Sequence, residues 1–294
     1  MSKVLVTGAS KGFGNLIVKT LLKDGHRVAA AMRGVGSRNK EAAQELKSLG
    51  AFPVEIDVTD EKSVKSGVSQ ALKELGGIDI AINNAGIGVL GLQEAFTVDD
   101  WKQIFEVNVF GVQRVNRAVL PHMREKRSGL LIHVSSLLGR VVMPFFGPYN
   151  ASKYALEALA DNYRIELSSF GIESVLIEPG GYATTFMDAV AYPSDKEAIK
   201  SYGPMADAPE QSMKGFEQLF AGPNPPNPQW VADAVSNVIK APRGQRPFRT
   251  TVDRVGMGAA VDPYNKAAEE MQKGLYAAFG MSDVLKLKTQ TATQ

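Results

Sequence analysis

Short apolar runs alternate with longer amphipathic stretches from Lys3 to about Glu178. This alternation is typical of a parallel sheet whose two faces are covered by crossover helices. Strands are predicted at 4–7, 27–32, 52–57, 78–83, 130–135 and 174–178. Helices with apolar residues near the 3.6 period are predicted between them, at 12–24, 39–49, 60–75, 99–125 and 149–169. The pattern therefore predicts a doubly wound parallel sheet in a three-layer α/β/α arrangement.

The pattern changes after Pro179. Residues 184–229 hold several Met and Phe residues and include a Pro-rich segment at 222–228. Apolar periodicity resumes at 230–239, a β-like run follows at 246–252, and a last helix is predicted at 264–279. We therefore predict one domain over 1–294, with 184–229 as a substrate-binding flap within it. Residues 281–294 are predicted to form a flexible tail.

Composition excludes several classes of protein. With 44% hydrophobic and 22% charged residues the chain is ordinary globular protein, and a net charge of +2 without a basic cluster predicts neither nucleic-acid nor membrane partners. There is no Cys, and the three His residues are scattered, so we predict no metal site. No signal-peptide core and no apolar run of about 18 residues is present, which indicates a cytoplasmic protein.

A glycine-rich segment, TGASKGFG at 7–14, follows the first predicted strand and opens the first helix. Glycines in this context allow the backbone to approach a pyrophosphate at a helix N-terminus, which favours dinucleotide binding in a Rossmann-type fold. The segment also matches the GxSxG pattern of serine hydrolases, with Ser10 as nucleophile. No strand precedes the first one to supply an oxyanion hole, so the hydrolase is the weaker alternative, beside a simple structural turn.

The end of the second predicted strand bears on the choice of cofactor. An NAD site usually carries Asp or Glu there, to bind the ribose 2′-hydroxyl. This strand instead ends Ala-Ala-Ala-Met at 29–32 and is followed by Arg33. Arg33 and Lys11 could flank a 2′-phosphate, so NADP is favoured over NAD. The alternative interpretation is two solvated cations.

Tyr149 and Lys153 are four residues apart at the start of a predicted helix and therefore share one face. Tyr192 and Lys196 have the same spacing, but only the first pair has a serine, Ser136, at a strand end thirteen residues earlier. Lowering a phenol pKa by two to three units requires roughly 3–4 kcal/mol, which an ammonium about 4–5 Å away can supply. Ser136 could hold a substrate carbonyl while Tyr149 delivers a proton; a capping serine and a surface pair are the alternative.

Together these motifs resemble the short-chain dehydrogenase/reductase family. The resemblance rests on segments that occur in family order over residues 3–184. They are TGASKGFG at 7–14, Asp57-Val58, NNAG at 83–86, NVFG at 108–111, Ser135-Ser136, YNASK at 149–153, and Pro179-Gly180 with Thr184. SKYALE at 152–157 and the chain length are similar to the branch of 17β-hydroxysteroid and retinol dehydrogenases.

The resemblance implies roles for individual residues. Tyr149 would be the general acid of a reduction, Lys153 would lower its pKa and bind the nicotinamide ribose, and Ser136 would hold the carbonyl. Asn108 would bind a water that links Lys153 to solvent. NADP(H) would be bound by Gly8, Ser10, Lys11, Gly12, Phe13, Gly14, Arg33, Asp57, Val58, Asn84, Ala85, Gly86, Tyr149, Lys153, Pro179, Gly180 and Thr184.

The substrate pocket is predicted between Ser136, Tyr149 and the flap, at the carboxyl ends of the strands. Tyr182 departs from the Val or Ile usual in the family. The apolar residues nearest the chemistry in sequence are Leu138, Met143, Phe145, Phe146, Tyr182, Phe186 and Met187, about half of which we expect to pack the flap onto the sheet.

These residues predict reduction of an aromatic or long aliphatic aldehyde or ketone. Two alternatives stay open, an alcohol dehydrogenase that works oxidatively with NAD and a dinucleotide-binding regulator without turnover. The helices at 99–125 and 149–169 carry enough apolar surface to pair with a second subunit, as in relatives. A homodimer or homotetramer is therefore expected.

Overall fold

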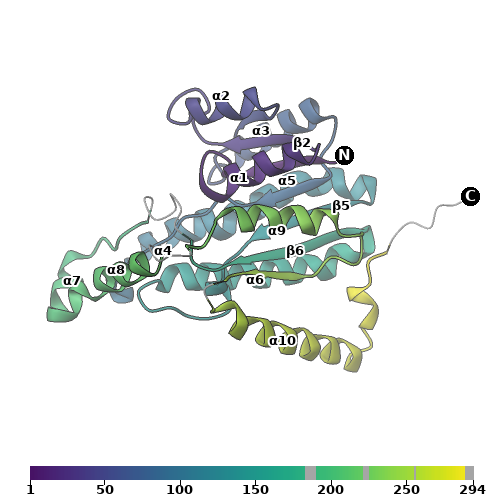
Figure 1. Cartoon of the computed structure of the whole chain (residues 1–294). Coiled ribbons are helices and arrows are strands. Elements are labelled where there is room, and N and C mark those ends of the chain that lie inside the picture. Colours follow the sequence, from purple (N-terminus) through teal and green to yellow (C-terminus); the bar gives the residue numbers. More distant parts are fainter. Residues whose placement is uncertain (183–189, 221–224, 255, 289–294) are drawn as a thin grey trace, which may run out of the picture.

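The computed structural model describes residues 1–182, 190–220, 225–254 and 256–288. A seven-stranded sheet with the order β3-β2-β1-β4-β5-β6-β7 lies between two layers of helices (Figure 1). All neighbouring strands pair in parallel. The strands are β1 (Lys3–Thr7), β2 (Arg27–Met32), β3 (Phe52–Glu55), β4 (Ile80–Asn83), β5 (Gly129–Val134), β6 (Ile172–Pro179) and β7 (Arg249–Val252). The predicted doubly wound α/β fold is confirmed.

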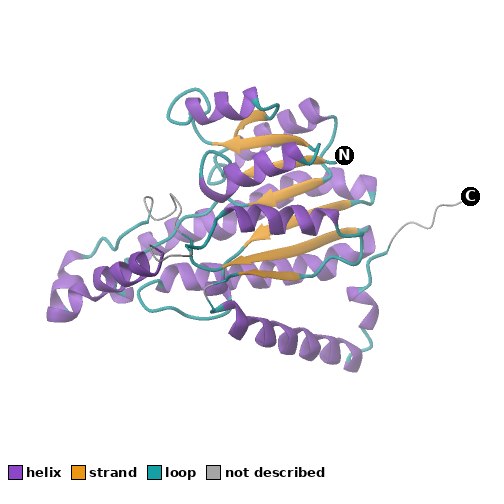
Figure 2. Ribbon diagram, in the orientation of Figure 1, coloured by secondary structure: helices purple, strands orange, loops and turns teal. Residues whose placement is uncertain are grey.

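Each face of the sheet has its own apolar core. On one face, side chains of the sheet pack against α1 (Gly12–Lys23), α2 (Lys40–Ser48) and α9 (Gln229–Lys240). On the other they pack against α3 (Glu61–Leu75), α5 (Gly111–Lys126) and α6 (Gly147–Leu167). Figure 2 shows the strands between these two helical layers. Strand order reverses at β1 and β4, and parallel sheets leave a crevice beyond the strand ends at such a point.

The helix predicted over 99–125 is interrupted. It consists of α4 (Val98–Phe105) and α5, joined by a π-helical turn at Glu106–Phe110. Asn108 lies within that turn and is buried. Such turns insert an extra residue into a helix and often occur at functional sites, whereas an apolar period cannot reveal them.

Part of the predicted flap is helical. The described portion of 184–229 contains α7 (Lys196–Ser201), a 3₁₀ turn at Gly203–Asp207 and α8 (Ala208–Phe220). It is joined to the body where the Leu90 N–H donates to the Ala191 carbonyl at 3.0 Å. Three residues assigned to the site in this stretch, Thr184, Phe186 and Met187, lie outside the described residues.

The C-terminal segment is more structured than predicted. Helix α10 (Gly258–Ala278) begins six residues before the predicted start at 264. A 3₁₀ turn at Ser282–Leu285 follows, and the Lys288 N–H donates to the Ser168 carbonyl at 3.0 Å. The described part of the predicted tail is thus folded onto the body, because backbone hydrogen bonds hold it. Over the described ranges, no helix combines the length and the apolar character of a membrane span.

Candidate active site

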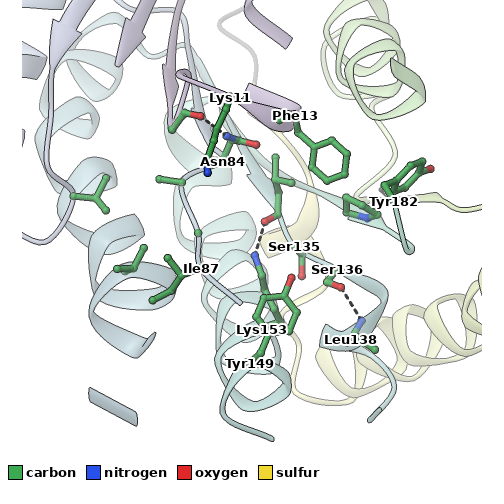
Figure 3. A pocket seen from close by; sticks show the side chains of 18 of the residues that line it. Lys11, Phe13, Asn84, Ile87, Ser135, Ser136, Leu138, Tyr149, Lys153 and Tyr182 are labelled. Carbon is green, nitrogen blue, oxygen red and sulfur yellow. Dashed lines mark hydrogen bonds between the residues drawn. The ribbon is translucent and has the colours of Figure 1, made fainter. Parts of the chain in front are cut away.

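A cavity of about 490 Å³ opens at the carboxyl ends of the strands. It extends from the glycine loop to Met213 on α8, and Figure 3 shows the part between Lys11 and Leu138. The residues assigned to the site from the sequence that line it are Gly8, Ser10, Lys11, Gly12, Phe13, Arg33, Asp57, Val58, Asn84, Ala85, Gly86, Ser136, Leu138, Met143, Phe146, Tyr149, Lys153, Pro179, Gly180 and Tyr182. Gly14, Asn108 and Phe145 are not among its lining residues.

The glycine loop has no room for a side chain at Gly8 or Gly14. Gly8 has a φ of +67°, and a Cβ added to Gly14 would lie 2.2 Å from the Gly8 carbonyl oxygen. Asn84 fixes the loop, because its Nδ2 donates to the carbonyls of Thr7 at 2.9 Å and Gly8 at 3.2 Å. Helix α1 starts here without a side-chain cap and without an acidic residue in its first turn. The first N–H groups of α1 are therefore suited to bind a phosphate. Gly14 does not line the cavity; it allows α1 to pack closely against the Gly8 carbonyl.

One end of the cavity is cationic. Lys11, Arg33 and Arg38 line it, and Arg33 Nη1 lies 3.7 Å from Asp57 Oδ2. Burial raises the pKa of Asp57, but hydrogen bonds from Thr59 and the charge of Arg33 outweigh it, so the pKa is lower than usual. With three cations and one carboxylate, this end of the cavity suits a phosphate group.

Two features of this end were missed in the sequence. Arg38 lies in the loop after β2, and only its basic character, five residues after Arg33, could have indicated it. Glu55 is an acid at the end of β3, but its carboxylate accepts the N–H groups of Gly34 at 2.7 Å and Val35 at 2.8 Å. It shapes this loop and is not among the residues that line the cavity.

Ser136, Tyr149 and Lys153 lie on one wall of the cavity (Figure 3). Helix α6 begins at Gly147 with Pro148 in its first turn, and this start places Tyr149 and Lys153 on the buried face. Lys153 Nζ lies 5.5 Å from the centre of the Tyr149 ring and donates to the Val134 carbonyl at 2.9 Å. The predicted grouping of phenol, ammonium and hydroxyl is present in the structure.

The electrostatics of this wall differ from the expectation. Burial raises the pKa of Tyr149 to about 12, against a hydrogen bond with Ser136 that lowers it. Burial also lowers the pKa of Lys153 to about 8, against the charge of Glu157, which raises it. In the protein alone, burial sets the direction of the shift, which is opposite to the fall expected from the sequence. At neutral pH Tyr149 carries its proton.

Asn108 lies behind this wall rather than in the cavity. Its Oδ1 accepts the Ile87 N–H at 2.9 Å, and its Nδ2 donates to the Ile87 carbonyl at 2.9 Å and to Ser152 Oγ at 3.0 Å. A Cβ added to Gly86 would lie 3.3 Å from Asn108 Oδ1 and 3.8 Å from Lys153 Nζ. The π-helical turn thus places Asn108 close to Lys153, where it ties the segment after β4 to α6.

The other end of the cavity is apolar. The side chains there belong to Ile87, Leu138, Met143, Phe146 and Met213. Met213 comes from α8, so the described flap does contribute to the wall, although the sequence did not single out that residue.

Of two aromatic residues assigned to the pocket, one lines the cavity and the other does not. Phe145 has a φ of +69°, and its carbonyl accepts the Gly91 N–H at 2.9 Å. It is not among the lining residues, so its assignment to the pocket is corrected: its side chain packs against the same apolar cluster as Met143 and Phe146 without lining the cavity. Tyr182 lines the cavity beside Phe13, at 5.5 Å between ring centres, while its hydroxyl donates to the Val252 carbonyl at 2.9 Å.

Comparisons with known proteins agree with this geometry. Residues 2–195 match the model of the short chain dehydrogenase family. The 3-ketodihydrosphingosine reductase of Bacteroides thetaiotaomicron is 33% identical over 249 residues, 85% of this chain and 87% of that protein. Human retinol dehydrogenase 8 is 31% identical over 253 residues, 82% of this chain and 78% of that protein. The chain therefore belongs to the short-chain dehydrogenase/reductase family, and the resemblance found in the sequence is confirmed.

Solved structures show the same architecture. A short-chain dehydrogenase from Streptomyces avermitilis superposes with a TM-score of 0.75 at 28% identity, covering 95% of this chain and 97% of that one. Serine dehydrogenase complexed with NADP⁺ superposes with a TM-score of 0.71 at 27% identity, covering 86% and 94%. Membership of the family makes this chain an oxidoreductase of CH–OH and C=O groups that binds a nicotinamide dinucleotide.

Proposed function

We propose that this oxidoreductase uses NADPH to reduce an apolar aldehyde or ketone to an alcohol. The observation that carries the proposal is the order of groups along one cavity. A glycine loop and three cations form one end, Ser136, Tyr149 and Lys153 form the middle, and apolar side chains form the other end. A dinucleotide with an extra phosphate would bind at the cationic end, and an apolar carbonyl compound would bind at the apolar end.

The residues present fit NADP(H). The Gly8–Gly14 contact leaves backbone exposed to a pyrophosphate at the start of α1. Lys11, Arg33 and Arg38 would bind the 2′-phosphate, and the serine dehydrogenase that superposes on this chain is complexed with NADP⁺. We assign the adenine contact to Asp57 and Val58 and the nicotinamide end to the segment from Pro179. When bound, NADPH supplies a hydride to the carbonyl carbon.

The side chains of the middle wall handle the carbonyl oxygen. Ser136 donates a hydrogen bond to that oxygen, and Tyr149, protonated at neutral pH, transfers its proton to it. The Lys153 ammonium stabilises the phenolate that remains, because an opposite charge a few ångströms away favours the ionised form. Asn108 positions the segment after β4 beside Lys153. We also propose that Asn108 binds a water molecule through which protons return from solvent to Lys153.

The apolar end of the cavity defines the substrate class. Met143 and Met213 are adaptable side chains, and Leu138, Ile87 and Phe146 complete an end where we find no charged group among the lining residues described. Two relatives are named for 3-ketodihydrosphingosine and retinol, and both compounds are largely apolar. These observations favour a long aliphatic or aromatic carbonyl compound over a charged one.

Oxidation of an alcohol is the second candidate, since one relative is named a retinol dehydrogenase. The protonated phenol of Tyr149 is the form that a reduction requires at neutral pH, whereas the oxidative direction requires the phenolate. A regulator without turnover would have no use for the buried Tyr149 and Lys153.

Two further features stay proposals. A homodimer or homotetramer would form through α4, α5 and α6, where Phe110 and Tyr154 are exposed. The cytoplasmic location stays a prediction from the sequence.

The direct test uses purified protein with NADPH or NADH and a panel of carbonyl compounds. Long aliphatic, aromatic and steroid-like carbonyls form one set, and short oxo acids form the control set. Oxidation of NADPH with members of the first set alone is the expected result. Turnover that favours the oxo acids, or that favours NADH, would overturn the assignment of substrate class or of cofactor, respectively.

A further inference from the structure

A cluster of buried charges lies directly behind Lys153. Glu157 lies one helical turn further along α6 and is 2% exposed, and Glu178 at the end of β6 is fully buried. Arg249 of β7 lies between them, with Nε 2.8 Å from Glu157 Oε2 and 3.4 Å from Glu178 Oε1. Its Nη2 lies 2.6 Å from Asp161 Oδ2. One guanidinium is thus shared by three carboxylates.

Further groups face this cluster from the loop after β5 and from α10. Asn265 donates to Glu178 Oε2 at 2.6 Å, and Arg140 donates to Asn265 Oδ1 at 2.7 Å. Arg140 therefore acts on Glu178 through an amide rather than by direct contact. In the described part of the chain Arg249 is the cation paired with all three carboxylates, which leaves two of the three negative charges without a contacting cation of their own.

Lys153 lies four residues before Glu157 on the same helix and is 6% exposed. Residues four apart on a helix are neighbours on its surface. Burial raises the pKa of Glu157 and raises that of Glu178 to about 7, the direction expected when carboxylates share too little positive charge. The charge of Glu157 in turn raises the pKa of Lys153 against the effect of burial.

We propose that Glu157, fixed by Arg249, is a positioning residue that keeps Lys153 charged and aimed at the phenol of Tyr149. Arg249 holds one carboxylate oxygen from β7, so the negative charge has a fixed place one helical turn from Lys153. The inference rests on the proposed function, in which Lys153 acts as an ammonium. It gives the edge strand β7 a part in the chemistry, although Arg249 is outside the cavity-lining set.

Packing around Glu157 supports a defined position. A Cβ added to Gly139 would lie 3.0 Å from Glu157 Cγ and 2.9 Å from Ser135 Oγ. The turn at Leu137–Gly139 therefore lies against both side chains, directly after Ser136. A displaced Glu157 would disturb the ammonium and the segment that carries Ser136 together.

A purely structural role is the competing explanation, since an ion pair between α6 and β7 also joins two elements. The two explanations differ in what happens to the proton on Lys153. If the pair only joined elements, removing its charge would lower stability and leave the titration of Lys153 unchanged. If Glu157 positions the ammonium, the titration must move.

Asp161→Asn supplies the matched control for Glu157→Gln. Both changes remove one carboxylate charge from α6 and one ion pair to Arg249, but Asp161 lies a further turn from Lys153. The titration of Lys153 is followed in the protein without cofactor, by trace acylation over a range of pH and mass spectrometry of the labelled peptide. We expect the midpoint to fall by about one pH unit in Glu157→Gln and by a few tenths at most in Asp161→Asn.

Equal midpoints in the wild type and Glu157→Gln, or equal shifts in the two variants, would overturn the inference. Glu157→Asp keeps the charge and should restore most of the midpoint. If Glu157→Gln is not recovered folded, the double variant Glu157→Met with Arg249→Met removes the pair as a unit and leaves no partner charge unpaired. Its Lys153 midpoint should also fall, because the nearer charge has been lost.

Turnover provides a second readout. The high-pH limb of the kcat profile should move down with the Lys153 midpoint in Glu157→Gln, while KM for the carbonyl compound stays unchanged. Because acylation needs neither cofactor nor substrate, a wild-type chain without carbonyl turnover would refute the proposed function alone. An unmoved Lys153 midpoint would refute this inference alone.

Discussion

Removal of the cationic end of the cavity should change the choice of cofactor. Arg33 and Arg38 line this end, and neither has an assigned role other than contact with a 2′-phosphate and the pairing of Arg33 with Asp57. A hydrogen bond to a charged group contributes about 1.5–3 kcal/mol. The Arg33 side chain is 48% exposed and pairs only at 3.7 Å, so the lower value applies. Arg33→Ala should therefore weaken NADPH binding about tenfold.

The assay is the Kd of NADPH and of NADH, measured by titration of cofactor fluorescence. Arg33→Ala with Arg38→Ala should weaken NADPH binding between tenfold and a hundredfold and leave NADH binding within about twofold, since NADH lacks the phosphate. Lys47→Ala is the control, because Lys47 is an exposed cation on α2 that is not among the lining residues. Added salt should weaken NADPH binding to the wild type more than NADH binding. Equal losses for both cofactors would refute the reasoning.

Three further changes test separate parts of the structure. Gly14→Ala should weaken both cofactors at least tenfold in the same titration, because its Cβ would meet the Gly8 carbonyl oxygen at 2.2 Å; unchanged binding would exclude the close contact. Lys153→Met should lower kcat at least about a hundredfold in the NADPH assay, because the phenolate of Tyr149 would lose the positive charge that stabilises it; a rate close to that of the wild type would contradict this. Burial lowers the pKa of His133 to about 3, so the unfolded chain binds a proton that the folded protein does not. The free energy of unfolding should therefore fall by about 1.4 kcal/mol per pH unit below about pH 6. His133→Gln should reduce that slope in unfolding measured at several pH values, and equal slopes would refute the reasoning.

Much of the fold follows from local patterns in the chain. Each βα repeat carries its own periodicity, so the strands from β1 to β6 were predicted within a few residues. The place of the chemistry follows as well, because parallel strands bring their carboxyl ends to one edge and the motifs occur just after those ends. Ser136 and Tyr149, thirteen residues apart, meet for this reason.

Other features depend on contacts that no local pattern records. The π-helical turn at Asn108 is one extra residue inside a helical period. Phe145 has a positive φ and packs against the apolar cluster without lining the cavity. The raised pKa of Tyr149 is set by how completely the rest of the fold buries it. Arg249 reaches Glu157 across 92 residues of sequence, and only the packing of β7 beside β6 brings the two together.

The segment predicted as a flap could be predicted in part from the sequence. Its length and its Met and Phe content indicated a segment over an apolar site, and Met213 on α8 does line the cavity. Which of its residues would face the cavity could not be predicted, because a helix laid against a site is oriented by tertiary contacts.

The central claim is that the phenol of Tyr149 is the proton donor in an NADPH-dependent reduction. The most direct measurement compares initial rates of NADPH oxidation by the wild type and by Tyr149→Phe, with one long aliphatic ketone at saturation and NADPH binding measured in parallel. The account predicts a loss of at least about a hundredfold in kcat, with a change of only a few fold in the NADPH Kd. A variant that retains its rate, or a wild type that turns over no carbonyl compound, would contradict the account.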